Sequence, residues 1–162
     1  MEPRVPDSAV LTVGVISDTH GLLRPEALAA LKGSDHIIHA GDVGDRSILH
    51  RLAAIAPVTA VRGNVDTATW AERLPPADAV ELGGRLFYVL HQREHLDLEP
   101  RAGGITAVIY GHSHKPSIEV RDGVLYLNPG SAGPRRFSLP VTVARVTVAA
   151  GGVEAAIVPL DV

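Results

Sequence analysis

Five short apolar runs recur along the chain, and polar or charged residues follow each of them. Nearly every position within a run is apolar, which is typical of strands buried on both faces, as in a parallel sheet. The runs span residues 10–17, 36–40, 58–62, 86–90 and 105–110. We therefore expect five core strands.

Two helices are predicted between the first three strands. Pro25 favours the first turn of a helix that runs to Leu31 and ends at Gly33. Asp45 is suited to cap a second helix, which Pro57 stops. The apolar stripe of this second helix consists of Ile48, Leu49, Leu52 and Ile55. The first third of the chain thus reads β-α-β-α-β.

The pattern changes after Val80. The pairs Gly83-Gly84, Asp122-Gly123 and Gly151-Gly152 each lie between extended segments, and such pairs are typical of tight antiparallel hairpins. We expect a second, more antiparallel sheet in this part of the chain. Two sheets need cover on their outer faces, so the pattern predicts a layered α/β sandwich with helices outside.

Composition limits the possible classes of protein. The chain has 162 residues, 46% of them hydrophobic, which fits a single domain over 1–162 with a short flexible tail at 1–7. The 15 basic against 18 acidic residues give a charge of −3, without the basic footprint of a nucleic-acid-binding protein. The absence of cysteine suits a reducing cytoplasm, and the apolar run 9–16 is too short to cross a membrane.

Polar side chains gather where the apolar strands end. In open α/β sheets the carboxyl ends of the strands form the rim at which ligands bind, so these side chains are candidates for one site. They are Asp18 and His20 after the first strand, Asp42 after the second, Asn64 and Asp66 after the third, His91 after the fourth, and His112 and His114 after the fifth.

This set of residue types points to a metal site. Imidazole, carboxylate and amide ligands without sulfur suit Mn, Fe, Zn, Ni or Co. With Asp66 left out, seven ligands remain; they are too many for one tetrahedral zinc, but they suit two ions that share a carboxylate. Two divalent ions would leave the pocket cationic after Asp18 and Asp42 are counted, which favours an anionic substrate such as a phosphate ester.

The motifs resemble a known family. "SDTHG", "HAGDV", "GNVD", the single His91, "GHSHKP" and "NPGSAGPR" occur in the order found in calcineurin-like metallophosphoesterases. The likeness spans roughly residues 12–136 and is strongest to the small single-domain branch, whose members act as phosphodiesterases. It implies a four-layer αββα sandwich with two mixed β-sheets.

The resemblance also implies a role for each matched residue. It assigns Asp18, His20, Asp42 and His114 to a first metal ion, and Asp42, Asn64, His91 and His112 to a second, with Asp42 as the bridge. A hydroxide bridging the ions would attack phosphorus in line, which makes Asp18, Asp42, Asn64 and His91 the catalytic set. Manganese is the first candidate metal, and Asn64 also contacts the substrate.

The chain departs from the wider family at two places. Many members carry a histidine at the position of Val65 that protonates the leaving group, although the small branch commonly lacks it. Gln92 follows His91 where glycine is usual, which makes His95 a rival for the role of His91. We prefer His91 because it directly follows a strand.

Other polar residues are expected to be structural or to contact substrate. Asp66 is interpreted as a loop-capping residue, and Asn128 as a tie between its own turn and the metal loops. The side chains of Arg135 and Arg136 are candidates for a substrate phosphate. His36, His39 and His50 are interpreted as structural histidines.

Three functions compete at this stage. The first is a dinuclear-metal phosphodiesterase or phosphatase acting on a small phosphate ester. The second is a non-catalytic scaffold of the same fold, like the related retromer subunit, and the third is a metal-dependent hydrolase of another ester or amide. The complete set of ligand types favours the first. Neither nucleic acid nor a membrane is an expected partner, and the sequence leaves the oligomeric state open.

Overall fold

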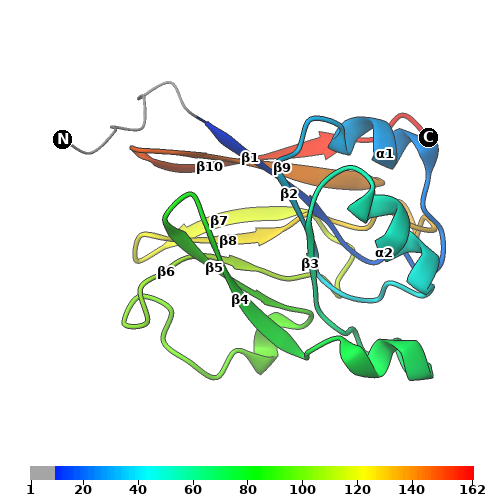
Figure 1. The fold of residues 1–162 in the computed structure, drawn as a ribbon, viewed down its shortest axis with the longest axis horizontal. Coiled ribbons are helices and arrows are strands. Elements are labelled where there is room, and N and C mark those ends of the chain that lie inside the picture. Colours follow the sequence, from blue (N-terminus) through cyan, green and yellow to red (C-terminus); the bar gives the residue numbers. More distant parts are fainter. Residues whose placement is uncertain (1–9) are drawn as a thin grey trace.

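Two five-stranded β-sheets pack face to face in the computed structural model, which describes residues 10–162 (Figure 1). The predicted tail at 1–7 lies outside the described residues. The first sheet has the order β10-β9-β1-β2-β3, with β1, β2 and β3 parallel. Its strands are β1 (Leu11–Ile16), β2 (His36–His39), β3 (Val58–Ala60), β9 (Thr142–Ala149) and β10 (Gly152–Pro159).

The second sheet has the order β4-β5-β6-β8-β7. Its three central strands are parallel and its two edges are antiparallel hairpins. The strands are β4 (Ala77–Leu82), β5 (Arg85–Leu90), β6 (Ile105–Ile109), β7 (Ser117–Arg121) and β8 (Val124–Asn128). Two of the three predicted hairpins therefore lie in this sheet. The third, at Gly151-Gly152, belongs to the first sheet because β9 pairs antiparallel with β1.

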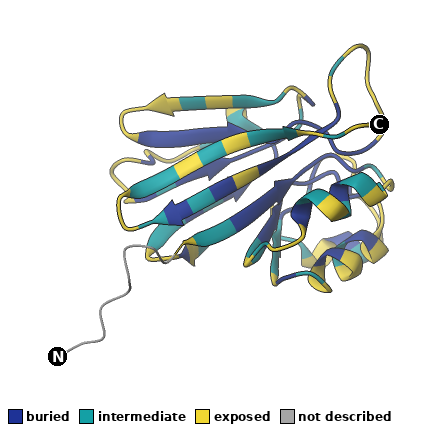
Figure 2. Ribbon diagram, turned by 90° about the horizontal axis from the view of Figure 1, so that it is seen from above, coloured by how far each residue is buried: buried dark blue, intermediate teal, exposed yellow. Residues whose placement is uncertain are grey.

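Both α-helices cover the outer face of the first sheet. They are α1 (Pro25–Leu31) and α2 (Arg46–Ala53), and the Asp45 carboxylate accepts the predicted capping hydrogen bond from the Ser47 N–H. Figure 2 shows the buried side of each helix turned toward the sheet and the exposed side toward solvent. Leu31 and Leu52 are fully buried on this inner side.

A loop and a short 3-10 helix cover the outer face of the second sheet. The helix η2 (Arg93–His95) follows β5, and the guanidinium of Arg93 lies 4.4 Å from the centre of the Tyr126 ring. Arg93 also pairs with Glu119 of β7 at 2.8 Å. The α/β fold with two mixed sheets is confirmed. Within residues 10–162 the fourth layer consists of this segment in place of an α-helix. A second 3-10 helix, η1 (Thr69–Arg73), precedes β4.

The main apolar core lies between the two sheets. Side chains such as Val13 and Val15 of β1 meet Phe87 and Val89 of β5, and all four are fully buried. Each such side chain stabilises the fold by about 1.5–3 kcal/mol through burial. This core holds the carboxyl ends of β1, β2, β5 and β6 next to one another. No helix in the described part of the chain is long and apolar enough to cross a membrane.

Candidate metal centre

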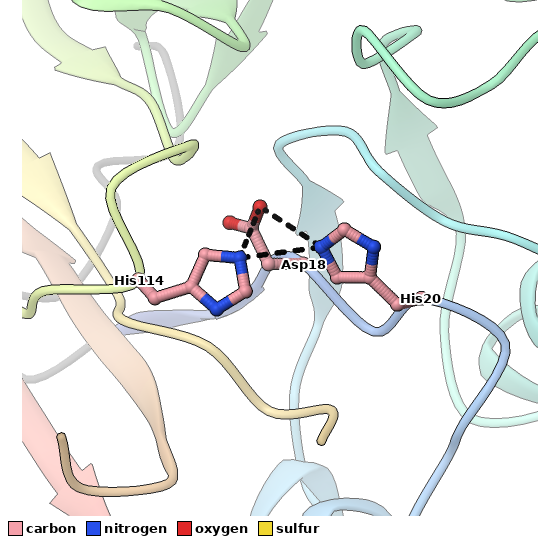
Figure 3. A group of neighbouring side chains, drawn as sticks. All are labelled: Asp18, His20 and His114. Atoms are coloured by element: carbon pink, nitrogen blue, oxygen red, sulfur yellow. Dashed lines mark hydrogen bonds and ion pairs between the residues drawn. The ribbon is translucent and has the colours of Figure 1, made fainter. Parts of the chain in front are cut away.

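The loops after β1, β2, β3, β5 and β6 bring all seven predicted ligands to one rim of the sandwich. Six of them form two groups whose possible ligand atoms lie within 4.8 Å of one another. The first group is Asp18, His20 and His114 (Figure 3), and the second is Asp42, His91 and His112. Asn64, the seventh predicted ligand, adjoins the second group, because its Oδ1 lies 3.2 Å from the Nδ1 of His112.

The first group is built around one carboxylate oxygen. Asp18 Oδ1 lies 3.4 Å from His114 Nε2 and 3.7 Å from His20 Nε2. The two Nε2 atoms are 3.2 Å apart, and Figure 3 shows both rings pointing at the same carboxylate. Three possible ligand atoms thus converge from loops that are 94 residues apart in the sequence.

The Asp42 carboxylate lies between the two groups. Its Oδ2 is 3.1 Å from His91 Nε2 and 3.6 Å from His20 Nε2. Asp18 Oδ1 also faces His91, at 3.8 Å, which is a longer approach. Asp18 is the closer carboxylate to His114, but Asp42 is closer than Asp18 to both His91 and His20, which belong to different groups, as a bridging ligand would be.

Three buried side-chain atoms of the site have no hydrogen-bond partner within the described residues. They are Asp18 Oδ1, His91 Nε2 and His114 Nδ1. The other polar side-chain atoms of Asp18 and His91 are hydrogen-bonded. Asp18 Oδ2 accepts hydrogen bonds from the Ser17 hydroxyl at 2.7 Å and the His112 N–H at 3.1 Å, and His91 Nδ1 donates to the Ala40 carbonyl at 2.7 Å. Buried polar atoms are rarely left unpaired, so the side chains fit a site that receives cations.

The electrostatics of the site favour positive charge at the same place. The nearby Asp18 carboxylate, 3.7 Å away, raises the pKa of His20, although burial opposes this. Burial alone would lower the pKa of His91, but the nearby carboxylates of Asp42 and Asp18 raise it overall. Burial would likewise raise the pKa of Asp42, and the contact with His91 and the hydrogen bond from the Val65 N–H lower it. The Asp42 carboxylate therefore remains ionised and attracts cations.

Five of the seven predicted ligands have a left-handed backbone. The φ angles of Asp18, His20, Asp42, His112 and His114 lie between 46° and 75°. This region is unfavourable for residues other than glycine, and such strain accumulates at functional sites. The loops therefore hold these side chains in a conformation that folding alone does not favour.

Several residues around the ligands fix the loops. Asp66 accepts three backbone hydrogen bonds, from Val43, Gly44 and Gly63, and so joins the loops after β2 and β3. The Asn128 amide donates to the Gly111 carbonyl and to the Ser113 hydroxyl in the loop after β6. Both residues have the structural role expected from the sequence.

Two supporting features escaped the sequence analysis. Ser17 is fully buried and orients Asp18, but a serine next to an aspartate carries no pattern that marks it. Gly63 is required because a Cβ there would collide with the backbone N and the carboxylate of Asp42. The sequence signal for this close approach of Gly63 to Asp42 was the glycine directly before Asn64.

The remaining histidines lie outside both groups. His39 is fully buried, with its Nε2 3.0 Å from the Thr19 hydroxyl and its Nδ1 accepting from the Gly41 N–H. His36 is hydrogen-bonded to Thr59, and His50 is exposed on α2. His95, the rival of His91, is exposed and lines a cleft beside the second group.

The two arginines at the rim have different surroundings. The Arg135 guanidinium donates to the carbonyls of Leu139 and Val162. Both Arg135 and Arg136 line a recess of about 280 Å³ together with His20 and His114. The pKa of His114 is lowered, first by burial and further by the charge of Arg136. Arg136 therefore acts electrostatically on the first group.

A two-sheet sandwich with paired carboxylates and histidines at one rim defines a class of metal-dependent hydrolases. Residues 11–151 match the family model of the calcineurin-like phosphoesterase superfamily domain. The chain belongs to this superfamily. The motifs that suggested the resemblance all lie within the matched residues.

Three similar proteins illustrate the range of the family. A protein of Methanocaldococcus jannaschii named as a probable metallophosphoesterase is 34% identical, over 93% of this chain and 82% of its own length. The solved structure of an archaeal phosphodiesterase is 24% identical with a TM-score of 0.77, covering 93% of this chain and 100% of that one. Vacuolar protein sorting 29 of Cryptosporidium parvum is 18% identical with a TM-score of 0.74, covering 93% and 98%. The two structures show the shared fold.

Proposed function

We propose that the protein is a dinuclear-metal phosphodiesterase whose ions are held by the two groups around Asp18 and Asp42. The observation that carries this proposal is the position of Asp42 Oδ2, which faces His91 at 3.1 Å and His20 at 3.6 Å. The proposed first set is Asp18, His20, Asp42 and His114, and the second is Asp42, Asn64, His91 and His112. Manganese is the proposed metal, with Fe, Zn, Ni and Co as alternatives that the same ligands accept.

The reaction is the hydrolysis of one ester bond. The oxygen of water forms a bond to phosphorus, the bond from phosphorus to one ester oxygen breaks, and the products are a phosphate monoester and an alcohol. When bound, a pair of divalent ions supplies Lewis-acid charge and lowers the pKa of coordinated water. The chain itself favours the ionised form of Asp42 and orients His91 through the Ala40 carbonyl. Two such ions would carry four positive charges, of which Asp18 and Asp42 would compensate two.

The source of the leaving-group proton is the least conventional part of the proposal. Val65 occupies the position of the family's acid, and it is exposed beside Asn64. A valine transfers no proton. We therefore propose that the departing oxygen leaves with little assistance from the protein.

A non-catalytic scaffold is the second candidate. The likeness to vacuolar protein sorting 29, with a TM-score of 0.74, favours it at the level of the fold. The full set of ligand types at the rim favours the enzyme. A scaffold would bind its partner at another surface, and the unfavourable backbone conformation of the candidate ligands would have no function in it.

The deciding experiment combines metal analysis with a substrate panel. Protein purified without chelator is analysed for metal and assayed with phosphomonoesters, phosphodiesters and carboxylic esters. Turnover of diesters that depends on added Mn supports the proposal. Turnover of carboxylic esters alone would establish the third candidate, and no turnover with any metal would favour the scaffold.

A further inference from the structure

A cleft of about 380 Å³ opens directly beside the second ligand group. Asn64 and His91 line both the cleft and the candidate metal centre, so an organic group attached to a phosphate at the centre can extend into it. The volume falls at the lower end of the range of about 300–1,000 Å³ that is common for small-ligand pockets. The recess beside His20 and His114 lies at the other group and is smaller, about 280 Å³.

The cleft has walls of two kinds. Pro76, Ala77, Tyr88 and Leu90, from the start of β4 and the end of β5, supply an apolar side with one aromatic ring. Gln92, His95 and Asp97, from the η2 segment, supply donors and acceptors. Small-ligand sites combine such an apolar surface with a few polar groups that fix orientation. This combination suits a ring system that carries hydrogen-bonding groups at its edge.

Arg62 is the strongest sign that the cleft receives a ligand. It is half-buried in the lining, and its guanidinium makes no ion pair or hydrogen bond with any residue in the part of the chain that the structure describes. Because these donors have no partner in the described chain, the guanidinium is available to a ligand, and its planar donors suit ring edges, ring faces and anionic groups. The backbone of Arg62 is fixed, because its N–H donates to the Pro75 carbonyl.

We propose that this cleft, with Arg62 as its recognition residue, binds one arm of a phosphodiester, and that this arm is a polar ring system of nucleoside size. The proposal rests on the phosphodiesterase function and adds to it the class of substrate. The diester's second arm lies toward the smaller recess at His20 and His114. A substrate with two small alkyl arms leaves the cleft empty and binds more weakly.

The test measures binding to the Mn-loaded protein by calorimetry, with three phosphate monoesters of equal charge. Ethyl phosphate has no ring, ribose 5-phosphate has only the sugar, and adenosine 5′-monophosphate has sugar and base. We expect adenosine 5′-monophosphate to bind at least about tenfold more tightly than ethyl phosphate, the factor that one hydrogen bond to a charged donor supplies. Equal Kd values for the three ligands would overturn the proposal, as would ribose 5-phosphate binding as tightly as the nucleotide.

Two substitutions test whether the preference for the nucleotide arises in the cleft. Arg62→Ala removes the guanidinium and Ala77→Phe fills the cleft, so each should lower the preference for the nucleotide over ethyl phosphate to within about twofold. The matched controls are Arg73→Ala, an exposed arginine in η1, and Ala79→Phe, an exposed position on β4, and both should keep the wild-type preference. If Arg62→Ala and Ala77→Phe behave like their controls, the nucleotide binds elsewhere and the proposal is wrong.

A parallel assay separates this inference from the function on which it rests. The same protein samples are tested for hydrolysis of bis(p-nitrophenyl) phosphate. Hydrolysis without a nucleotide preference overturns the cleft proposal and leaves the phosphodiesterase standing. A nucleotide preference that depends on Arg62, without hydrolysis of any diester, supports the cleft and overturns the phosphodiesterase.

Discussion

The two ends of the sandwich place different residues in the left-handed region of the backbone. At the hairpin end, on the left in Figure 1, the exposed turns place mostly glycines at positive φ, such as Gly83 and Gly123, with one aspartate, Asp122. At the opposite end glycines such as Gly41 share the same region with Asp18, His20, Asp42, His112 and His114. Each side chain there costs about 1–2 kcal/mol relative to glycine. The site end therefore holds more side chains in this unfavourable region than the hairpin end does.

The two ends also differ in what they bury. Around Gly83 the neighbours are apolar, such as Val148 and Leu11. At the site end the chain buries Asp18, Asp42, His91 and His114 within a few ångströms of one another. Buried charge of one kind is unfavourable unless it is paired. We therefore expect cations to stabilise the site end and to leave the hairpin end unaffected.

Metal removal should give the largest effect. With chelator we expect diester hydrolysis to fall to background, and with Mn restored we expect activity to return with about two ions per chain. Bound metal should also stabilise the fold, by about 2.7 kcal/mol when the free ion is at 100 times its Kd. Elemental analysis and thermal unfolding measure the two quantities. A stoichiometry near zero after reconstitution contradicts the assignment of the site.

Replacing the proposed bridging carboxylate should give the next largest effect. Asp42→Asn keeps the shape but removes the charge next to both groups, so it should lose more activity than His20→Ala, which removes one proposed ligand of the first group. The control at the hairpin end is Asp122→Asn, another aspartate with positive φ, which should leave kcat/KM unchanged. Equal losses for Asp42→Asn and His20→Ala would show that Asp42 does not bridge.

Because no acid stands at position 65, we expect the rate of hydrolysis to depend steeply on the acidity of the leaving group. With Val65 in place, aryl diesters with acidic phenols should react much faster than those with weakly acidic phenols. General acid catalysis contributes about 10² to 10⁴-fold, so Val65→His should recover up to that range for the poorest leaving groups and flatten the plot. A series of substituted phenyl diesters under saturating metal measures both slopes. A flat plot for the wild type would mean that another group already donates the proton.

Acid should destabilise the site end through His39. Burial lowers the pKa of His39 to about 4, whereas the unfolded chain has the ordinary value near 6.5. Between these values the unfolded chain binds more protons, so the free energy of unfolding falls as the pH drops from 6.5 to 4, by up to about 3 kcal/mol. His39→Asn should start less stable at pH 7 and lose less over this range in urea denaturation. If the free energy of unfolding of the wild type and of His39→Asn falls equally between pH 6.5 and 4, the low pKa assigned to His39 is wrong.

The smallest expected effect concerns the cost of a side chain at positive φ, which can be measured at both ends. In metal-free protein, His112→Gly should be more stable than His112→Ala by about 1–2 kcal/mol, because φ at this position is 75°. At the hairpin end Gly123→Ala should lose a similar amount. Urea denaturation of the four proteins measures both differences. If alanine and glycine are equally stable at position 112, the site end is not strained there.

Much of the fold followed from the apolar pattern. The five predicted strands and two helices are present, because a buried strand or an amphipathic helix needs its hydrophobic residues at fixed spacing. The pattern did not show which sheet the last hairpin joins. That choice depends on the pairing of β9 with β1, which are more than 120 residues apart, and local periodicity carries no information about such a partner. The 3-10 helices η1 and η2 were also missed, since they lack a repeating apolar stripe.

The sequence by itself determined which residue types gather at the site and the strand end on which each candidate ligand lies. Residue types and their place after apolar runs were sufficient to name Asp18, Asp42 and His91, because parallel strands deliver their carboxyl ends to one rim. Only the tertiary structure decided how these side chains group, which oxygen of each carboxylate is left for a cation, and that Arg62 lies beside them with no partner in the described chain. The reason is physical: distances of 3 to 4 Å between residues 49 to 96 positions apart arise from the packing of the two sheets, and no local segment encodes them.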